Sequence, residues 1–308
     1  MNEIYQKTLS KTVSFEGIAL HSGKKSKIKL CPAQEGQGII FKRTDLSNNN
    51  LIKANFSNVS SARLCTTLEN EHGIKVSTVE HLLAAFYITG IDNAVVEIDS
   101  EELPIMDGSS KDFIDELQKT KLLDQSKKRK YLKIIDNIEL VDGKRKISIK
   151  SNQSSLEIDF QLNYENRIIG KQKNVVDFQR DNLEEISSSR TFCLFEDIEK
   201  IKKFGLAKGG SLDNAIVVDD KKVLNKGGLR NDKEFVNHKI LDLAGDFMLS
   251  GYRVIGKVLC YQGGHELTNL FLRKIFKTPD SFKLTEIDNF KVSEKHPQKE
   301  LQKIAVNA

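Results

Sequence analysis

The sequence of 308 residues contains few cysteines and no long apolar run. The longest stretch without a polar residue, Leu82 to Ile88, is much shorter than the about 18 residues that would indicate a membrane-spanning helix. The N-terminal segment also lacks the apolar core of a signal peptide. No integral membrane segment is therefore expected. The cysteines lie far apart and form no CxxC pair, so neither a disulfide framework nor a cysteine-based zinc finger is expected, and a reducing cytoplasm is the expected location. They are Cys31, Cys65, Cys193 and Cys260.

A large surplus of one charge is also missing, because the formal net charge is only +5 at pH 7. The basic residues form no cluster interleaved with aromatic residues, as a nucleic-acid-binding face would. Nucleic acid is therefore not expected as a partner. The small surplus is compatible with a local anion site, such as one for a phosphorylated substrate.

Each half of the chain places predicted strands before predicted helices, an order typical of α+β folds with helices on one face of each sheet. We expect two α+β domains, at residues 1–124 and 132–290. A basic segment at 125–131 without apolar anchors is interpreted as the linker, with a charged helix end as the alternative. The remaining residues, 291–308, form a polar tail.

Apolar periodicity and capping signals predict the main helices, and Ser77 or Thr78 is expected to cap the first of them. Gly90 is expected to end that helix. The predicted helices cover residues 79–89, 110–123, 194–203, 232–249 and 265–276, and the predicted strands of the second half cover 133–140, 146–151, 156–162, 215–218 and 253–261.

The helix predicted at 232–249 carries the most informative polar residues. His238, Asp242 and Asp246 recur every four residues and therefore share one face. The rest of this helix is largely apolar, and a buried stripe of imidazole and carboxylates costs free energy unless something binds it. The spacing of His238 and Asp242 suits a metal site, although a solvated polar face or an ordinary His–Asp pair has the same pattern.

Two further histidines have suggestive neighbours. Glu80 and His81 lie in the first turn of a helix, about 100° apart, so one can bind a metal while the other faces a water molecule. The helix dipole alone would explain Glu80 but not His81. His265 follows two glycines at a helix start, where a protonated imidazole needs a carboxylate such as Asp246; the alternative is a helix cap. His21 is a possible peripheral site residue.

Together these segments resemble one family, the zinc-dependent UDP-3-O-acyl-N-acetylglucosamine deacetylases of lipid A biosynthesis. The resemblance extends in order over most of the chain, from about residue 17 to 265. The matching segments are Gly17–Gly23, Ser77–Leu82, Gly90–Asn93, Leu103–Ser109, Ser189–Phe192, Gly209–Ser211, Leu224–Asn225, His238–Asp242 and Gly264–His265.

The resemblance implies two β-α-α-β-like domains packed against each other, each with a small insert and with zinc at their interface. It implies hydrolysis of the N-acetyl group of UDP-3-O-(3-hydroxyacyl)-N-acetylglucosamine. The products are acetate and UDP-3-O-(3-hydroxyacyl)-glucosamine, in the committed step of lipid A biosynthesis. The expected partner is this nucleotide-sugar substrate with its acyl chain, and the protein is expected to be monomeric.

The resemblance also implies residue roles. His81, His238 and Asp242 would hold Zn²⁺, with Fe²⁺ possible in the cell and a fourth position open. Glu80 would be the general base, and Thr191 would help to hold the oxyanion. His265, kept charged by Asp246, would protonate the leaving amine, and Lys239 would face the substrate as a fixed positive charge. An insert of the second domain would form an apolar passage for the acyl chain, for which the alternative is ordinary core packing. The residues expected along it are Ile18, Phe192, Phe195, Ile198, Ala207, Gly210, Ser211, Leu212, Ala215 and Val217.

Two other classes of protein compete with this interpretation. A non-haem Fe(II) oxygenase also uses two histidines and one carboxylate, but such enzymes usually take their ligands from barrel strands. Here two ligands share one helix and a glutamate adjoins the third, which favours hydrolysis. A non-enzymatic nucleic-acid-binding module is disfavoured by the missing basic face.

Overall fold

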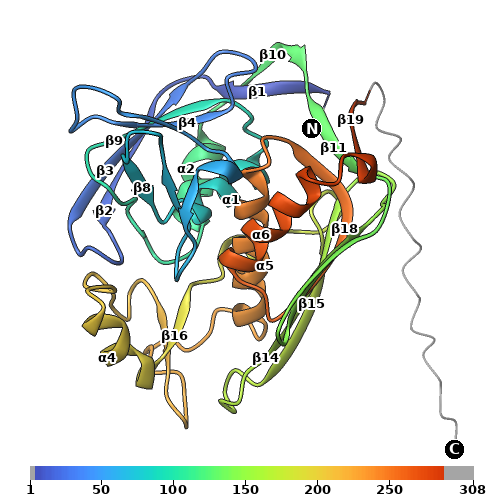
Figure 1. Cartoon of the computed structure of the whole chain (residues 1–308). Coiled ribbons are helices and arrows are strands. Elements are labelled where there is room, and N and C mark those ends of the chain that lie inside the picture. The colour runs from blue at the N-terminus through green and yellow to red at the C-terminus, as the bar shows by residue number, and fades with distance from the viewer. Residues whose placement is uncertain (1–3, 288–308) are drawn as a thin grey trace, which may run out of the picture.

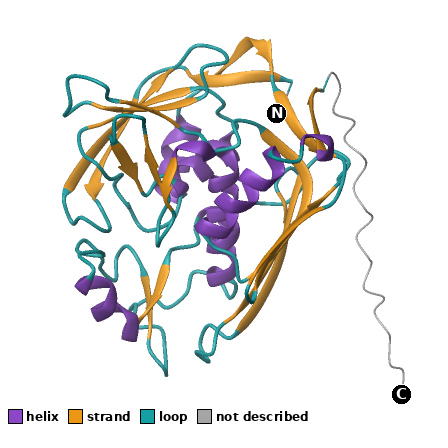
Figure 2. Ribbon diagram, in the orientation of Figure 1, coloured by secondary structure: helices purple, strands orange, loops and turns teal. Residues whose placement is uncertain are grey.

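The computed structural model describes residues 4–287, so the predicted tail at 291–308 lies outside the described residues. A central layer of helices lies between two β-sheets (Figures 1 and 2). Strands and helices both contribute extensively, and the α+β class is as predicted. Within residues 4–287, no helix combines the length and apolar character needed to cross a membrane.

The first sheet has five strands from the N-terminal part of the chain. In β3 (Lys25–Pro32) alternate residues such as Ile28 and Leu30 are buried, which is the period of two expected for a strand with one covered face. The order is β2 (Val13–Ile18), β3, β9 (Ala94–Ile98), β4 (Ile39–Arg43) and β5 (Leu51–Lys53). Helices α1 (Glu80–Thr89) and α2 (Lys111–Lys119) contact each other in the central layer.

The start of α1 corrects one prediction. Neither Ser77 nor Thr78 caps this helix, since the N-cap residue is Val79 and makes no side-chain capping bond. Ser77 ends strand β8 (Lys75–Ser77), and the hydroxyl of Thr78 bonds to Glu102 at 3.1 Å. Both candidate caps are therefore committed to tertiary structure. The predicted end is confirmed, because Gly90 adopts a φ of 88°.

The basic segment 125–131 consists mainly of β-strand residues, so the alternative of a charged helix end is wrong. Residues Leu122–Lys128 form β10, which pairs antiparallel with β1 (Tyr5–Leu9), and β11 (Lys130–Ile134) follows. Arg129 between the two strands is only 4% exposed and bonds to Asp92. A paired buried charge thus anchors the segment where the sequence offers few apolar residues. Strand β10 also explains why α2 ends before the predicted 123.

The second sheet has seven strands, with β18 (Arg253–Tyr261) in its middle. The predicted strand at 133–140 is two strands, because β11 ends at Ile134 and β12 starts at Ile138. The path is β12 (Ile138–Asp142), β13 (Arg145–Lys150), β18, β11 and β19 (Phe282–Glu286), with β14 (Leu156–Asn163) joining β18 to β15 (Lys171–Asp177).

Helices α5 (Glu234–Met248) and α6 (His265–Phe276) pack on this second sheet, α5 against β14 and β15 and α6 against β12 and β13. The predicted bounds of α6 and β18 are confirmed. In α5 every residue except Lys239 is buried. Helices α1 and α5 touch through their backbones at Gly245, where a Cβ atom would overlap the carbonyl oxygen of Glu80.

The remaining elements lie beside these layers. A small subdomain, at the lower left of Figure 1, contains β16 (Phe192–Leu194), which pairs parallel with β17 (Ile216–Val218), and α4 (Phe195–Lys203). Strands β6 (Val59–Ser61), β7 (Thr67–Glu69) and β8 form a three-stranded sheet. The short helices are η1 (Phe56–Asn58), α3 (Glu184–Ser187) and η2 (Pro279–Ser281).

Candidate metal centre

The three predicted metal ligands meet between α1 and α5. His81 lies in the first turn of α1, and His238 and Asp242 lie one turn apart on α5. Their candidate ligand atoms all lie within 4.8 Å of one another, and all three residues are buried. Asp242 Oδ1 is 3.5 Å from His81 Nε2 and 3.3 Å from His238 Nε2.

The protonation of these residues suits metal binding. His238 Nδ1 lies 3.1 Å from the carbonyl oxygen of Ser189, to which it can donate, leaving the Nε2 lone pair toward the cluster. Burial lowers the pKa of His238 to about 3, with like-charged neighbours adding to the effect, so its imidazole is neutral. Burial alone would raise the pKa of Asp242, but the ammonium of Lys239, 2.7 Å from Oδ2, opposes this, and the pKa of Asp242 lies well below its usual range.

An unpartnered buried oxygen indicates that a cation fits here. Asp242 Oδ1 is buried and has no hydrogen-bond partner, although the Nε2 atoms of His81 and His238 lie 3.5 and 3.3 Å from it. Buried polar atoms are almost always paired in proteins, so an unpaired carboxylate oxygen between two imidazoles is costly without a ligand. Two histidines and one carboxylate with an open position are typical of catalytic zinc and of non-haem iron. Within residues 4–287 this is the only group of three or more metal-ligating side chains.

Glu80 and His265 border the same centre from two helices. Glu80 precedes His81 on α1, and its Oε1 is 3.6 Å from His265 Nε2, at the start of α6. Burial raises the pKa of Glu80 above its ordinary value, although the two nearby imidazoles partly oppose this. A carboxylate with a raised pKa accepts a proton more readily than an exposed one.

His265 is held in its protonated form by Asp246. Its Nδ1 lies 2.8 Å from Asp246 Oδ2. Burial would lower the pKa of His265, but Asp246 and Glu80 outweigh it and raise the pKa to about 10. The predicted pairing of His265 with Asp246 is therefore present, and the site holds a carboxylate suited to accept a proton beside an imidazolium suited to donate one.

A small cavity of about 30 Å³ lies between the three candidate ligands, Glu80 and His265, which all line it. Thr191 and Lys239 also line it, as do His21, the possible peripheral site residue of the sequence analysis, and Cys65, which the sequence analysis did not place in the site. Both ring nitrogens of His21 are buried without a hydrogen-bond partner. Burial, followed by Glu80, raises the pKa of the Cys65 thiol to about 12, so this cysteine is protonated. A lone cysteine in a loop gives no sequence signal for this placement.

A second, larger cavity of about 350 Å³ adjoins the first. Leu20, His21, Leu64 and Thr191 line both, so the two spaces are neighbours separated by no more than these side chains. Every residue proposed for the acyl passage lines this cavity except Ile18, which is 39% exposed and packs near Gly209. The lining residues from that set are Phe192, Phe195, Ile198, Ala207, Gly210, Ser211, Leu212, Ala215 and Val217.

Known proteins resemble this chain in sequence over nearly its whole length. The family model described as UDP-3-O-acyl N-acetylglycosamine deacetylase matches residues 6–277. The chain belongs to that family. It is 40% identical over 288 residues to the UDP-3-O-acyl-N-acetylglucosamine deacetylase of Shewanella frigidimarina, covering 92% of this chain and 94% of the relative. It is 41% identical over 284 residues to the enzyme of that name from Geobacter sp., covering 92% of each, and 40% identical over 298 residues to that of Histophilus somni, covering 96% of each.

Membership of this deacetylase family lends no support to the oxygenase alternative. The similarity also covers both halves of the chain, so the residues from α1 and those from α5 and α6 belong to one matched region.

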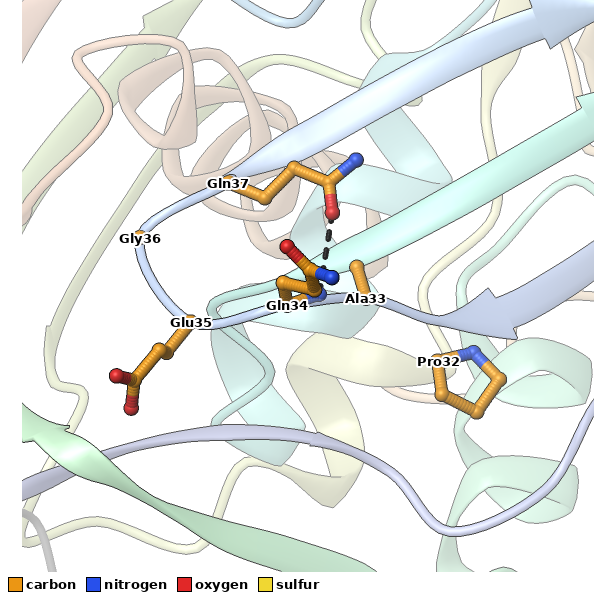
Figure 3. Close-up of a pocket in the computed structure, with 6 residues that line it drawn as sticks. All are labelled: Pro32, Ala33, Gln34, Glu35, Gly36 and Gln37. Carbon is orange, nitrogen blue, oxygen red and sulfur yellow. Dashed lines mark hydrogen bonds between the residues drawn. The ribbon is translucent and has the colours of Figure 1, made fainter.

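Another surface depression carries no comparable chemistry. It borders the loop at residues 33–38, between β3 and β4 (Figure 3). The backbone N–H of Gln34 donates to Gln37 Oε1 at 3.1 Å, and Glu35 accepts bonds from Ser126 and from the backbone of Lys127. The single carboxylate of this loop is thus tied to β10.

Proposed function

We propose that this protein hydrolyses the N-acetyl group of UDP-3-O-(3-hydroxyacyl)-N-acetylglucosamine. The names of its relatives describe them as deacetylases of UDP-3-O-acyl-N-acetylglucosamine, which supports this proposal. The products are acetate and UDP-3-O-(3-hydroxyacyl)-glucosamine, an intermediate of lipid A biosynthesis. One observation carries the proposal: three buried metal-ligating side chains share a small cavity with Glu80 and His265.

In this proposal His81, His238 and Asp242 hold one Zn²⁺, for which the neutral imidazole of His238 and the ionised Asp242 provide suitable donors. Bound there, Zn²⁺ supplies Lewis-acid chemistry by acidifying water and polarising a carbonyl oxygen. Fe²⁺ accepts the same ligands, so the metal present in the cell is decided by supply as well as by the site.

Glu80 takes one proton from the attacking water as the new C–O bond forms. Its position beside His81 on α1 and its raised pKa support this role. Thr191, which lines the cavity, donates a hydrogen bond from its hydroxyl to the developing oxyanion. Lys239 presents a fixed positive charge to the substrate, while its ammonium also bonds to Asp242 and lies 5.5 Å from the centre of the Phe192 ring.

His265 delivers a proton to the sugar nitrogen as the C–N bond breaks, which releases acetate and the free amine. Its bond to Asp246 and its pKa of about 10 support this role, since the imidazolium persists at neutral pH. The close approach of Glu80 Oε1 and His265 Nε2, at 3.6 Å, supports the proposal that the two residues act on the same bound substrate.

The acyl chain of the substrate occupies the 350 Å³ cavity that adjoins the metal centre. Its lining is largely apolar and includes the partly exposed side chains of Phe195 and Leu212 at the surface. Each methylene buried in such a cavity contributes about 0.8 kcal/mol. This extension would anchor the substrate while the acetamido group faces the metal ligands.

We further propose a division into two domains, 1–124 and 132–290, with the zinc between them and with a monomer as the working unit. The separate five-stranded and seven-stranded sheets, which enclose the shared helical layer, support that division. His81 comes from the first part and His238 from the second, which supports a metal at their interface.

The direct test is release of acetate from the acylated UDP-N-acetylglucosamine by the purified protein, with and without a chelator. We expect turnover that a chelator abolishes, that added Zn²⁺ restores and that does not depend on oxygen. Turnover that persists in the metal-free protein would contradict the proposal.

A further inference from the structure

Thr66 contacts Glu80 and Asp246, the carboxylate that holds His265. It lies just before β7 and is only 2% exposed. Its backbone N–H donates to Glu80 Oε2 at 3.0 Å, and its hydroxyl donates to Asp246 Oδ1 at 2.7 Å. These partners are 14 and 180 residues away in the sequence, so one residue connects the proposed base to the carboxylate behind the proposed acid.

We propose that Thr66 is a positioning residue of the deacetylation reaction, which sets the orientation of Glu80 through its backbone and of His265 through Asp246. The inference rests on the proposed function, because it takes the roles of Glu80 and His265 from there. Thr66 itself is not required to touch the substrate.

The two oxygens of Asp246 have different partners, and this difference carries the argument. Oδ2 lies 2.8 Å from His265 Nδ1, whereas Oδ1 accepts the Thr66 hydroxyl. A carboxylate held at one oxygen cannot rotate freely about its terminal bond, so the Thr66 hydroxyl fixes the direction in which Oδ2 meets the imidazole. That direction in turn sets where His265 Nε2 points.

The backbone around Thr66 is itself fixed at the start of α1. The carbonyl oxygen of Thr66 accepts the N–H of Val79, the N-cap residue of α1, and Thr67 pairs with Ser77 in the sheet. Thr66 thus moves with the helix turn that carries Glu80 and His81. The placement of the base and the acid is coupled through this short segment.

The experiment compares Thr66→Val, which keeps the shape and the backbone N–H, with Thr66→Ser, which keeps the hydroxyl. We expect Thr66→Val to lower kcat by about tenfold to a hundredfold, the range for losing a hydrogen bond to a charged group. KM and the metal content should stay close to those of the parent protein, and Thr66→Ser should recover most of kcat. Thr89→Val removes another threonine hydroxyl, which bonds to Ala85 within α1, and should leave kcat unchanged.

A double-mutant cycle with Asp246→Asn tests the route of the effect. If Thr66 acts through Asp246, Thr66→Val should reduce kcat far less in the Asp246→Asn protein than in the parent. An undiminished effect there, full activity of Thr66→Val, or equal damage by Thr66→Ser would each overturn the proposal. Should Thr66→Val fail to fold, Thr66→Ala removes the same hydroxyl without any β-branched shape to accommodate.

The same cycle distinguishes failure of this proposal from failure of the proposed function. If Asp246→Asn retains full activity, the acid role of His265 is wrong, and the positioning role that depends on it is overturned as well. If Asp246→Asn is impaired but Thr66→Val is not, only the role of Thr66 fails. The NMR resonance of the proton on His265 Nδ1, observed in ¹⁵N-labelled protein, gives a second readout. If the imidazole loses its fixed orientation, this resonance should shift or broaden in Thr66→Val and not in Thr89→Val.

Discussion

The two ends of α1 both bury charged side chains, but in different ways. At its C-terminal end Arg129 and Arg253 flank Asp92, and all three are largely buried. Arg129 donates to Asp92 and to the Gly90 carbonyl, while Arg253 donates to the carbonyl oxygens of Tyr87 and Phe86. Cationic groups on the last carbonyls of a helix are favoured by its dipole.

At the N-terminal end the charges are not fully matched from within the protein. Asp242 Oδ1 and His81 Nδ1 have no hydrogen-bond partner, although both are buried. At the C-terminal end Arg253 Nε also lacks a hydrogen bond, but it lies 3.7 Å from Asp92 Oδ1 and the other nitrogens of that guanidinium are bonded. Buried charge alone therefore does not identify a functional site. Three metal-ligating side chains that converge on one another, with a buried carboxylate oxygen that lacks a hydrogen bond, are what distinguish the candidate site.

The largest expected effect on activity is at the N-terminal end of α1, where the buried charges are not fully matched (the unmatched end). His81→Ala and His238→Ala should each lose the bound metal and all detectable deacetylation, because each removes one of three ligands. Metal analysis of the purified variants, read beside acetate release, checks this. Full metal content in the variant that carries both changes would refute the ligand assignment.

Removing the base should leave the metal in place. Glu80→Gln should lower kcat by about a hundredfold to ten-thousandfold, the usual contribution of a general base, with unchanged metal content. In the parent protein the rate should be bell-shaped in pH. It should fall at acidic pH as Glu80, whose pKa is raised, becomes protonated, and fall at alkaline pH as His265 loses its proton toward about 10.

The acidic limb of that profile should disappear in Glu80→Gln. Near-full activity of this variant would mean that Glu80 only contributes a negative charge to the helix start.

At the matched end a substitution should affect stability and spare the metal. Asp92→Ala leaves the guanidinium groups of Arg129 and Arg253 facing each other, and we expect the free energy of unfolding to fall by about 3–5 kcal/mol. Urea denaturation measures this change. Replacing Arg129 by Met in the same protein should recover part of the loss, and metal content should match that of the parent in both variants.

The smallest effect is expected in the apolar cavity beside the unmatched end. Ala215→Trp should raise KM for a long-acyl substrate by about tenfold, which corresponds to roughly two methylenes displaced from apolar contact. The slow turnover of an analogue without the acyl chain should hardly change. An equal loss on both substrates would indicate damage to the fold, and no loss on either would return Ala215 to ordinary core packing.

The local parts of the site were predictable from the sequence. His238 and Asp242 are four residues apart on one helix, so their proximity follows from helix geometry. The position of His265 at a helix start follows from the glycines before it. Only the resemblance to a known family predicted that His81, on α1, would face His238 and Asp242 on α5. A contact between two helices far apart in the sequence has no local signal.

Other features could not be predicted, for physical reasons that differ. The strand at 122–128 is stabilised by pairing with β1 and by the buried Arg129, neither of which leaves an apolar pattern. Ser77 and Thr78 have the right chemistry for a helix cap, but tertiary hydrogen bonds use them elsewhere. Thr66 is an ordinary residue in the sequence, and only its two distant partners distinguish it.

Gly245 has no side chain to separate α1 from α5, the two helices that carry the proposed ligands. The backbone of α5 contacts the carbonyl of Glu80 directly at this point. The distance between His81 and Asp242 is therefore set by main-chain atoms. Apolar neighbours can be exchanged for others of similar volume without a change in that distance. A methyl group at position 245 would push the two helices apart and so increase the distance between the proposed ligands, even if the surrounding core stayed unchanged.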